Sequence, residues 1–375
     1  MDAIPGAVNC DTTVKISGET YNESVVVRGK NLTGNYTIKL LGSMTTSDSG
    51  TSTGTNTNAF PITQTRFNDT GKAWTASAHI GRLLKLTGGT GSTQTYPYRI
   101  ILGNSATYLD LTGVWDTLPD ATSTYRILGF ATTIDSASST GNIYVAPGQK
   151  GITVQHIAFI GASAAGVWTE NASVNILGCK FANVSGYNTG IYYTAGSTGE
   201  SNINYIPASG PGYGIRITSS YINAYHNYLI AGTASTAALF IETAGGVSIS
   251  SPYLKGNYLS GGAQGGLYLF ANAMLSGMDN CWVTGGTYGI HLNHNSVARI
   301  VANNLIENAI SHGIFCNNGH ILFASSASST NIRNNGGWGV YGQLTSTGQN
   351  MTVPTYTTNT SGTWSFAAAS YSYGS

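Results

Sequence analysis

The residues best suited to chemistry recur once every 23 to 28 residues between positions 168 and 341. Six carry aromatic rings, and the other two are an arginine and a histidine: Trp168, Tyr192, Arg216, Phe240, Tyr268, His291, Phe315 and Tyr341. Aromatic rings pack against the C–H faces of sugars, an arginine neutralises negative charge, and a histidine exchanges a proton near neutral pH. The set predicts a glycan-binding surface. Arg216 and His291 are its candidates for the charge neutraliser and the base of a polysaccharide lyase.

A repeated phrase places these eight residues on one face. Each is the third residue of a small–aliphatic–variable–apolar phrase that starts at Gly166, Gly190, Gly214, Ala238, Gly266, Gly289, Gly313 or Gly339. This period, with strand-like and glycine-rich units, is typical of a solenoid. Side chains alternate along a strand, so the aliphatic residues point inward and the variable residue points outward. Coils spaced ~4.8 Å apart would stack the eight residues into an aromatic ladder roughly 34 Å long.

The next outward row lies two residues further along each strand and contains Glu170 and Glu242. Beside the aromatic ladder, such polar side chains suit the hydroxyl groups of a glycan, so we include both glutamates in the predicted site. Glycoside hydrolysis uses two carboxyl groups about 5–10 Å apart. Glu170 and Glu242 lie three coils apart, or about 14 Å at ~4.8 Å per coil. The sequence therefore excludes them as a catalytic pair.

The aromatic ladder has two other interpretations. A long aromatic stripe also suits contact between subunits, for which we expect a homotrimer. Another segment of the same chain could equally cover it. The sequence leaves all three open.

An asparagine precedes the phrase in five successive coils: Asn204, Asn227, Asn257, Asn280 and Asn304. Asparagine tolerates the left-handed backbone of a tight corner, and stacked amides can hydrogen-bond from coil to coil. We interpret this row as structural.

The chain divides into four expected parts. Residues 1–42 form a first coil, and 43–128 form a loop (43–65) followed by a small inserted β module. The main solenoid spans 129–343, and the tail, 344–375, is expected to cap its open end. Alternating apolar residues predict strands near 14–16, 25–27, 36–40, 83–86, 100–102, 109–111 and 125–127.

The coil length, the asparagine row and the glycine phrase resemble the right-handed parallel β-helix of the pectate-lyase-like superfamily. Asp2–Pro5 and Gly18–Val27 resemble the start of such domains, with the usual capping helix largely missing. The insert resembles β modules of bacteriophage tail proteins at Asn68–Thr75, Gly89–Gly91, Trp115–Asp116 and Pro119–Tyr125. The aspartate clusters of pectate lyases, pectin methylesterases and polygalacturonases are absent from the sequence. The resemblance therefore implies the fold, an all-β parallel helix with an inserted module, and leaves the reaction open.

Composition narrows the possible partners. Charged residues make up 8% of the chain, the net charge is +1, and no Lys/Arg cluster occurs, which disfavours nucleic acid. No apolar run is long enough for membrane insertion. The cysteines Cys10, Cys179, Cys281 and Cys316 are expected to be free thiols, and no cofactor or metal is expected.

We derive three functional hypotheses. The first is a phage tailspike-like protein of the virion tail that binds a host-surface glycan; the hypothesis leaves open whether the protein also cleaves that glycan as a depolymerase. An N-terminus without signal-peptide features, free thiols and the phage-like insert favour it. The second is an extracellular polysaccharide lyase or glycoside hydrolase. The third is a structural component of a virion or filament.

Overall fold

The computed structural model describes residues 7–8, 10–29, 31–32, 36–54, 56–59, 64–113, 115–136, 141–161, 164–182, 189–209, 212–232, 236–243, 252–343, 347–350, 355–366 and 371–373. Among them, one short 3-10 helix, η1 (Ser325–Ser329), accompanies an otherwise all-β fold. The N-terminal motif Asp2–Pro5 lies outside the described residues.

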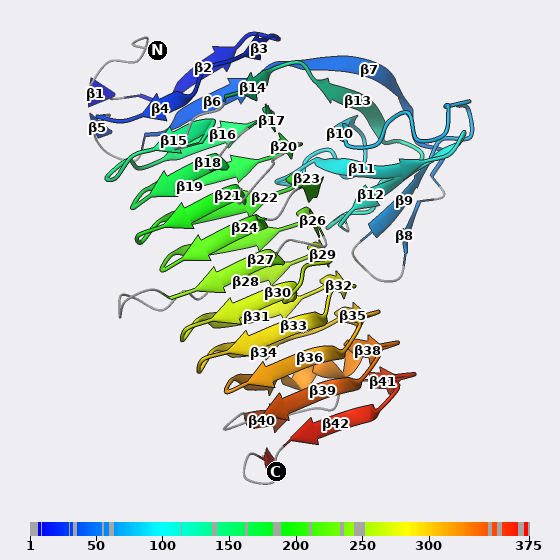
Figure 1. The fold of residues 1–375 in the computed structure, drawn as a ribbon. Coiled ribbons are helices and arrows are strands. Elements are labelled where there is room, and N and C mark those ends of the chain that lie inside the picture. The colour runs from blue at the N-terminus through cyan, green and yellow to red at the C-terminus, as the bar shows by residue number, and fades with distance from the viewer. Residues whose placement is uncertain are drawn as a thin grey trace.

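The protein is a right-handed parallel β-helix, as the sequence predicts (Figure 1). Along the main helix, each coil passes through a second, a third and then a first parallel sheet. The first sheet contains β2 (Thr12–Ile16), β6 (Ile38–Gly42), β16 (Ile152–Gln155), β19 (Ser173–Leu177), β22 (Thr198–Asn202), β25 (Tyr221–Tyr225), β28 (Tyr253–Lys255), β31 (Met274–Asp279), β34 (Val297–Ile300), β37 (His320–Phe323), β40 (Thr347–Asn350) and β43 (Tyr371–Tyr373). The second contains β3 (Thr20–Tyr21), β14 (Thr133–Asp135), β17 (Ala158–Ile160), β20 (Lys180–Phe181), β23 (Tyr205–Ser209), β26 (Tyr228–Ala231), β29 (Tyr258–Ser260), β32 (Trp282–Thr284), β35 (Leu305–Glu307), β38 (Asn331–Arg333) and β41 (Thr355–Thr357). The third contains β4 (Val25–Val27), β15 (Ile143–Val145), β18 (Ala165–Glu170), β21 (Thr189–Thr194), β24 (Tyr213–Thr218), β27 (Ala237–Glu242), β30 (Gly265–Phe270), β33 (Tyr288–Asn293), β36 (His312–Asn317), β39 (Trp338–Gln343) and β42 (Gly362–Phe366).

The core is a column of inward aliphatic side chains. Ile176 of the first sheet, Phe181 of the second and Ile191 of the third are fully buried in one cluster, and equivalent residues repeat in the other coils. Removing this apolar surface from water is the main favourable term in folding. Because the inward positions are apolar, their outward neighbours are free to carry functional side chains.

The asparagine row is a buried hydrogen-bond ladder at the corner between the first and second sheets. The Asn204 main-chain N–H donates to Asn227 Oδ1 at 3.0 Å, and the Asn227 N–H donates to Asn257 Oδ1 at 3.0 Å. The expectation that Asn280 belongs to this ladder is wrong, because Asn280 occupies the left-handed corner at φ 50°. Cys281 takes the ladder slot and donates its main-chain N–H to Asn304 Oδ1. In this coil Trp282 faces outward and Val283 inward, which shifts the pattern by one residue.

The insert is a separate antiparallel sheet with strand order β7-β13-β10-β11-β12-β9-β8. Its strands are β7 (Met44–Thr51), β8 (Thr57–Ala59), β9 (Gln64–Asn68), β10 (Leu83–Gly88), β11 (Tyr98–Asn104), β12 (Tyr108–Thr112) and β13 (Thr124–Phe130). Near the N-terminus, β1 (Ala7–Val8) and β5 (Asn31–Leu32) form a further parallel pair. The four strands expected at 83–127 are confirmed.

Two segments differ from the expectation. Residues 43–65, expected as a loop, contain β7 and β8. The Ser/Thr-rich β7 lacks apolar alternation because it is largely exposed, and β13 supplies its hydrogen-bond partners. In the expected cap, β40, β41, β42 and β43 continue the three parallel sheets.

The insert docks on the corner between the first and second sheets. Leu83, Tyr98 and Ile100 of the insert form a buried cluster with Ile203 of the corner. The Tyr96 hydroxyl also donates to Glu200 Oε2 at 2.8 Å. Figure 1 shows the insert beside β20, β23 and β26. This placement leaves one flank of the insert facing the first sheet and the other facing the second.

Candidate functional site

The predicted aromatic ladder exists in the expected register on the third sheet. Cα pairing runs through Tyr144, Trp168, Tyr192, Arg216, Phe240, Tyr268, His291, Phe315 and Tyr341. Tyr144, which precedes the first glycine phrase, extends the ladder by one coil.

The rings of the aromatic ladder stack on one another along the helix axis. Phe240, Tyr268, His291 and Phe315 are all less than 9% exposed. The Tyr268 and His291 ring centroids lie 4.6 Å apart at 18°, and those of Phe240 and Tyr268 lie 5.2 Å apart. In these four coils the ring faces pack against neighbouring rings, so a ligand would meet mainly ring edges. Trp168, Tyr192, Arg216 and Tyr341 remain half-exposed.

The two glutamates of the predicted site already have partners. Glu242 Oε1 accepts from Arg216 Nε at 3.1 Å and from the Thr218 hydroxyl at 2.7 Å. Burial opposes charge on Arg216, but its hydrogen bonds to Glu242 raise the pKa of the guanidinium above its ordinary value. Glu170 accepts from the Tyr144 hydroxyl at 2.7 Å. Each glutamate therefore has a structural role, because its bonds link its own coil to the preceding one.

The structure does not bring Arg216 and His291 together. They are three coils apart in the ladder register, or about 14 Å at ~4.8 Å per coil. The guanidinium carbon of Arg216 lies 4.9 Å from the Tyr192 ring centroid. Burial, followed by the charge of His294, lowers the pKa of His291 to about 4. A neutral, buried imidazole is a poor base for a substrate at the surface, and Arg216 is already paired.

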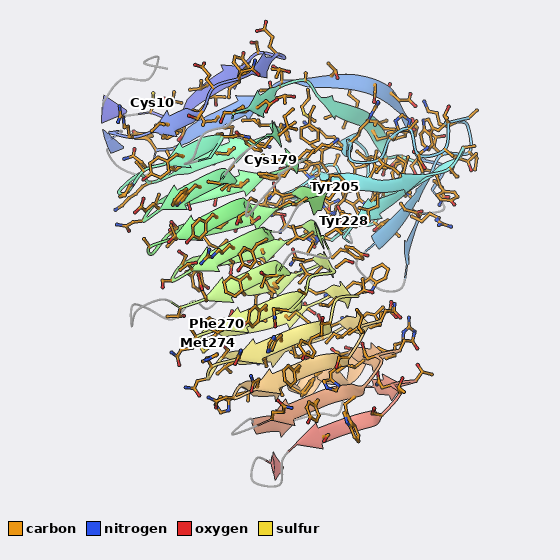
Figure 2. All side chains as sticks on the ribbon, in the orientation of Figure 1. Cys10, Cys179, Tyr205, Tyr228, Phe270 and Met274 are labelled. Atoms are coloured by element: carbon orange, nitrogen blue, oxygen red, sulfur yellow. The ribbon has the colours of Figure 1, made fainter. Side chains whose placement is uncertain are left out.

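A second aromatic row, which the sequence analysis missed, lies on the second sheet. Tyr205, Tyr228, Tyr258 and Trp282 occupy one outward position in four successive coils. The first three rings stack at centroid distances of 5.5 and 4.5 Å, and all four side chains are half-exposed. Tyr205 and Tyr228 lie beside the insert (Figure 2). An aromatic residue directly before the inward apolar residue in each coil was the available sequence signal.

A cavity of about 390 Å³ lies where the insert faces the first sheet, and we call it the first-sheet cleft. Its walls carry three tyrosines, two carboxylates, one lysine and further polar side chains: Thr95, Tyr96, Asp116, Asn202, Tyr225, His226, Tyr253, Lys255 and Asp279. Register explains part of the grouping, because Tyr225, Lys255 and Asp279 are Cα partners in β25, β28 and β31. Asp116 comes from the opposite wall, formed by the insert.

The carboxylates of the first-sheet cleft differ in environment. Burial raises the pKa of Asp279 above its ordinary value, although bonds to Asn280 and the Lys255 charge act against the increase. Its Oδ1 atom is buried and has no hydrogen-bond partner among the described residues. Asp116 is exposed. A half-buried carboxyl group with a raised pKa thus shares a cavity with an exposed carboxyl group, an arrangement suited to acid–base chemistry.

The described ranges contain no helix that is long and apolar enough to cross a membrane. They also contain no cluster of three or more His, Cys, Asp or Glu side chains that could hold a metal ion.

No protein-family model and no curated protein sequence matches the chain. Among solved structures, a periplasmic alginate epimerase mutant shares 13% identity at a TM-score of 0.41, covering 65% of this chain and 73% of its own. The tailspike of Pseudomonas phage LKA1 shares 12% identity at a TM-score of 0.27, with coverages of 95% and 68%. The tailspike of Acinetobacter baumannii bacteriophage AP22, solved with capsular saccharide, shares 9% identity at a TM-score of 0.26, with coverages of 96% and 73%.

Proposed function

We propose that the protein binds a polysaccharide in the first-sheet cleft and cleaves it there by hydrolysis. The observation that carries the proposal is the joint presence of three tyrosines, Asp116, Lys255 and Asp279 around one cavity. Tyrosine rings offer apolar surface to a sugar, while their hydroxyls, the lysine and the carboxylates bond its hydroxyl groups. This mixture of ring surface and convergent polar groups is typical of small-ligand sites.

Hydrolysis needs one proton donor and one proton acceptor. Asp279, whose pKa is raised by burial, would donate its proton to the glycosidic oxygen as the C–O bond breaks. Asp116, on the facing wall, would accept a proton from the water whose oxygen attacks the anomeric carbon. The products are two shorter saccharides, and one molecule of water is consumed.

The biological setting remains a prediction from sequence. A surface poor in charge and rich in hydroxyls and amides suits the hydroxyl groups of a host-surface glycan. We place the protein in a virion tail or outside the cell, with the homotrimer as the expected assembly. Light scattering tests the assembly, because a monomeric mass would contradict the trimer.

The glycan-binding role of the aromatic ladder also remains a prediction. Tyr192→Ala with Tyr268→Ala tests it against the first-sheet cleft. Because Tyr268 is buried, folding of the double variant must first be verified by circular dichroism. Glycan binding unchanged in a folded double variant would leave the ladder as packing or as a subunit interface.

The deciding experiment compares Asp279→Asn with the control variant Asp110→Asn. Asp110 belongs to the insert, forms an ion pair with Arg66 at 3.0 Å and lies outside the cleft. Both variants and the parent protein are incubated with a polysaccharide panel and assayed for new reducing ends and for the ultraviolet absorbance of unsaturated sugars. We expect Asp279→Asn to retain binding and to lose cleavage by about a hundredfold or more, the usual scale of general acid catalysis. Full cleavage by Asp279→Asn, or unsaturated products, would contradict the hydrolytic site.

A further inference from the structure

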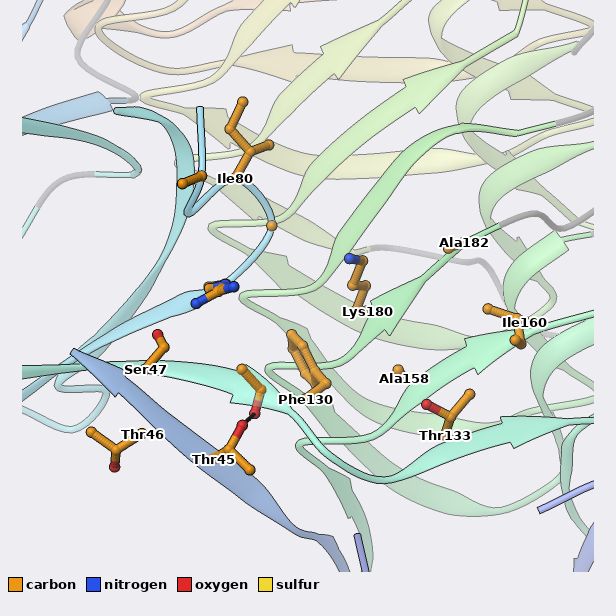
Figure 3. Close-up of a pocket in the computed structure, with 14 residues that line it drawn as sticks. Thr45, Thr46, Ser47, Ile80, Phe130, Thr133, Ala158, Ile160, Lys180 and Ala182 are labelled. Atoms are coloured by element: carbon orange, nitrogen blue, oxygen red, sulfur yellow. Dashed lines mark hydrogen bonds between the residues drawn. The ribbon is translucent and has the colours of Figure 1, made fainter. Parts of the chain in front are cut away.

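A second cavity, of about 600 Å³, lies on the other flank of the insert, and we call it the second-sheet cleft. Its walls come from β7 and β13, from the insert loop at 78–82, and from β14, β17 and β20 of the second sheet. Figure 3 shows Lys180, Thr133 and Ala158 on the second-sheet side and Ile80 and Phe130 on the insert side.

The charges in this cleft are all of one sign. Arg82 and Lys180 line it, and no aspartate or glutamate does. Both side chains are half-buried, and neither belongs to any of the four ion pairs found among the described residues. Burial, followed by the nearby Arg82 charge, lowers the pKa of Lys180. Two cations held near each other in a partly desolvated cavity repel, and a bound anion would relieve that cost.

The remaining walls indicate a ligand larger than a simple anion. Thr45, Thr46, Ser47 and Thr133 provide hydroxyl groups, while Ile80, Phe130 and Ile160 provide apolar surface. The volume falls within the range of about 300–1,000 Å³ that is usual for organic ligands. An inorganic phosphate would fill a small part of it and leave the apolar walls without contacts.

The second-sheet cleft borders the aromatic row of the second sheet through Gly81. Gly81 has φ +75°, and a Cβ placed there would lie 3.1 Å from the Tyr205 ring and 3.5 Å from Lys180 Nζ. Lys180 and Tyr205 are also Cα partners in β20 and β23. The basic cleft and the row Tyr205–Tyr228–Tyr258–Trp282 therefore form one continuous outward path along the second sheet.

We infer that the second-sheet cleft binds an acidic saccharide, with the carboxylate of a uronic acid unit between Arg82 and Lys180. The sugar ring would contact Ile80 and Phe130, and the adjoining units would follow the tyrosine row. This inference adds a second saccharide site to the proposed function and rests on that function for the sugar. The anion site itself depends only on the two cations.

The test is isothermal titration of the parent protein, Arg82→Gln, Lys180→Gln and the double variant. The probes are oligogalacturonate, its carboxyl-reduced neutral counterpart, and inorganic phosphate. Arg299→Gln, an exposed cation on the first sheet, is the matched control. Loss of one charge-assisted contact should weaken oligogalacturonate binding by about ten- to hundredfold, with the control unchanged. The neutral counterpart should bind the parent protein more weakly and be insensitive to both substitutions.

A measurement on the unsubstituted protein removes dependence on the folding of the variants. Acylation of Lys180, followed by mass spectrometry of its peptide, should slow more when oligogalacturonate is present than when the neutral counterpart is present at the same concentration. Equal protection by both saccharides would overturn the assignment of the carboxylate to Lys180.

The outcomes separate the two proposals. Unchanged oligogalacturonate binding in the double variant would overturn the acidic-saccharide site while leaving cleavage at Asp279 intact. Phosphate that binds as tightly as oligogalacturonate and displaces it would show a simple anion site and overturn the sugar assignment. If no saccharide of either panel binds the parent protein, the proposed function itself fails.

Discussion

Removing one amide from the asparagine ladder should cost several kcal/mol of stability. Asn227 is fully buried, and its Oδ1 accepts from the Asn204 main-chain N–H at 3.0 Å and from Asn204 Nδ2 at 3.1 Å. Its Nδ2 donates to the Ser201 carbonyl at 2.8 Å and to Asn257 Oδ1 at 3.0 Å. The Ser201 hydroxyl donates a fifth, longer bond to Asn227 Oδ1 at 3.3 Å, and Asn227→Ala removes all five.

The main term in this cost is the orphaned Asn204 N–H. A buried donor left without an acceptor costs about 1–3 kcal/mol, and each other lost bond adds about 0.5–1.5 kcal/mol. Because Asn204 Nδ2 keeps its bonds to Ile176 O and Ser201 Oγ, the sum is nearer the lower end, at about 3–5 kcal/mol. The contact between the coils that carry Asn204 and Asn227 should therefore become the weakest contact between coils in the solenoid.

Equilibrium unfolding in guanidinium chloride, followed by tryptophan fluorescence and circular dichroism, measures the change. Asn317→Ala is the control, because Asn317 is half-exposed on the outer face of β36, where a substitution should change stability by less than about 0.5 kcal/mol. A cost for Asn227→Ala below about 1 kcal/mol, or equal to that of the control, would refute the view that the ladder stabilises the corner.

Three further predictions concern acidity, thiols and the corner. Because burial lowers the pKa of His291 to about 4 from about 6.5 in the unfolded chain, the unfolded state binds more protons between these values. The contribution of neutral His291 to the free energy of unfolding is therefore present above pH 6.5 and is lost as the pH falls to 4, a loss of up to about 3 kcal/mol. His291→Phe should flatten that part of the profile of stability against pH, and an unchanged profile would contradict the assignment. Burial raises the pKa of Cys179 and Cys281 to about 12, and Cys316 is equally buried, so iodoacetamide should label only exposed Cys10 in the native protein and all four thiols after denaturation. Gly256→Ala should destabilise the protein by about 1–3 kcal/mol, because φ is +66° and the new Cβ would meet the His226 ring; Gly148→Ala, with φ +79° and open space, isolates the backbone part of the cost.

The repeat alone determined the fold and most of its register. Alternation along each phrase separates inward from outward side chains, and the spacing of the phrases sets which residues become neighbours on adjacent coils. The aromatic ladder follows from these two rules. The same register makes Glu307 and Arg333 Cα partners in β35 and β38, where their side chains form an ion pair at 2.8 Å. The wrong prediction for Asn280 has the same origin. The coil is shifted by one residue before Trp282, so Asn280 occupies the corner and Cys281 takes its place in the asparagine ladder, although the sequence still shows an asparagine at the expected spacing.

Only the tertiary structure decided where the clefts lie. Tyr96 hydrogen-bonds to Glu200, which lies 104 positions away in the sequence, and the insert that carries Tyr96 does not follow the repeat of the coils. Its docking depends on the shape and apolar match of Tyr98 and Ile100 with Ile203 at a corner whose residues look unremarkable in sequence. The first-sheet and second-sheet clefts exist because a non-repeating module covers that corner. A period fixes contacts between coils, but packing of non-repeating surfaces depends on side-chain shape in three dimensions.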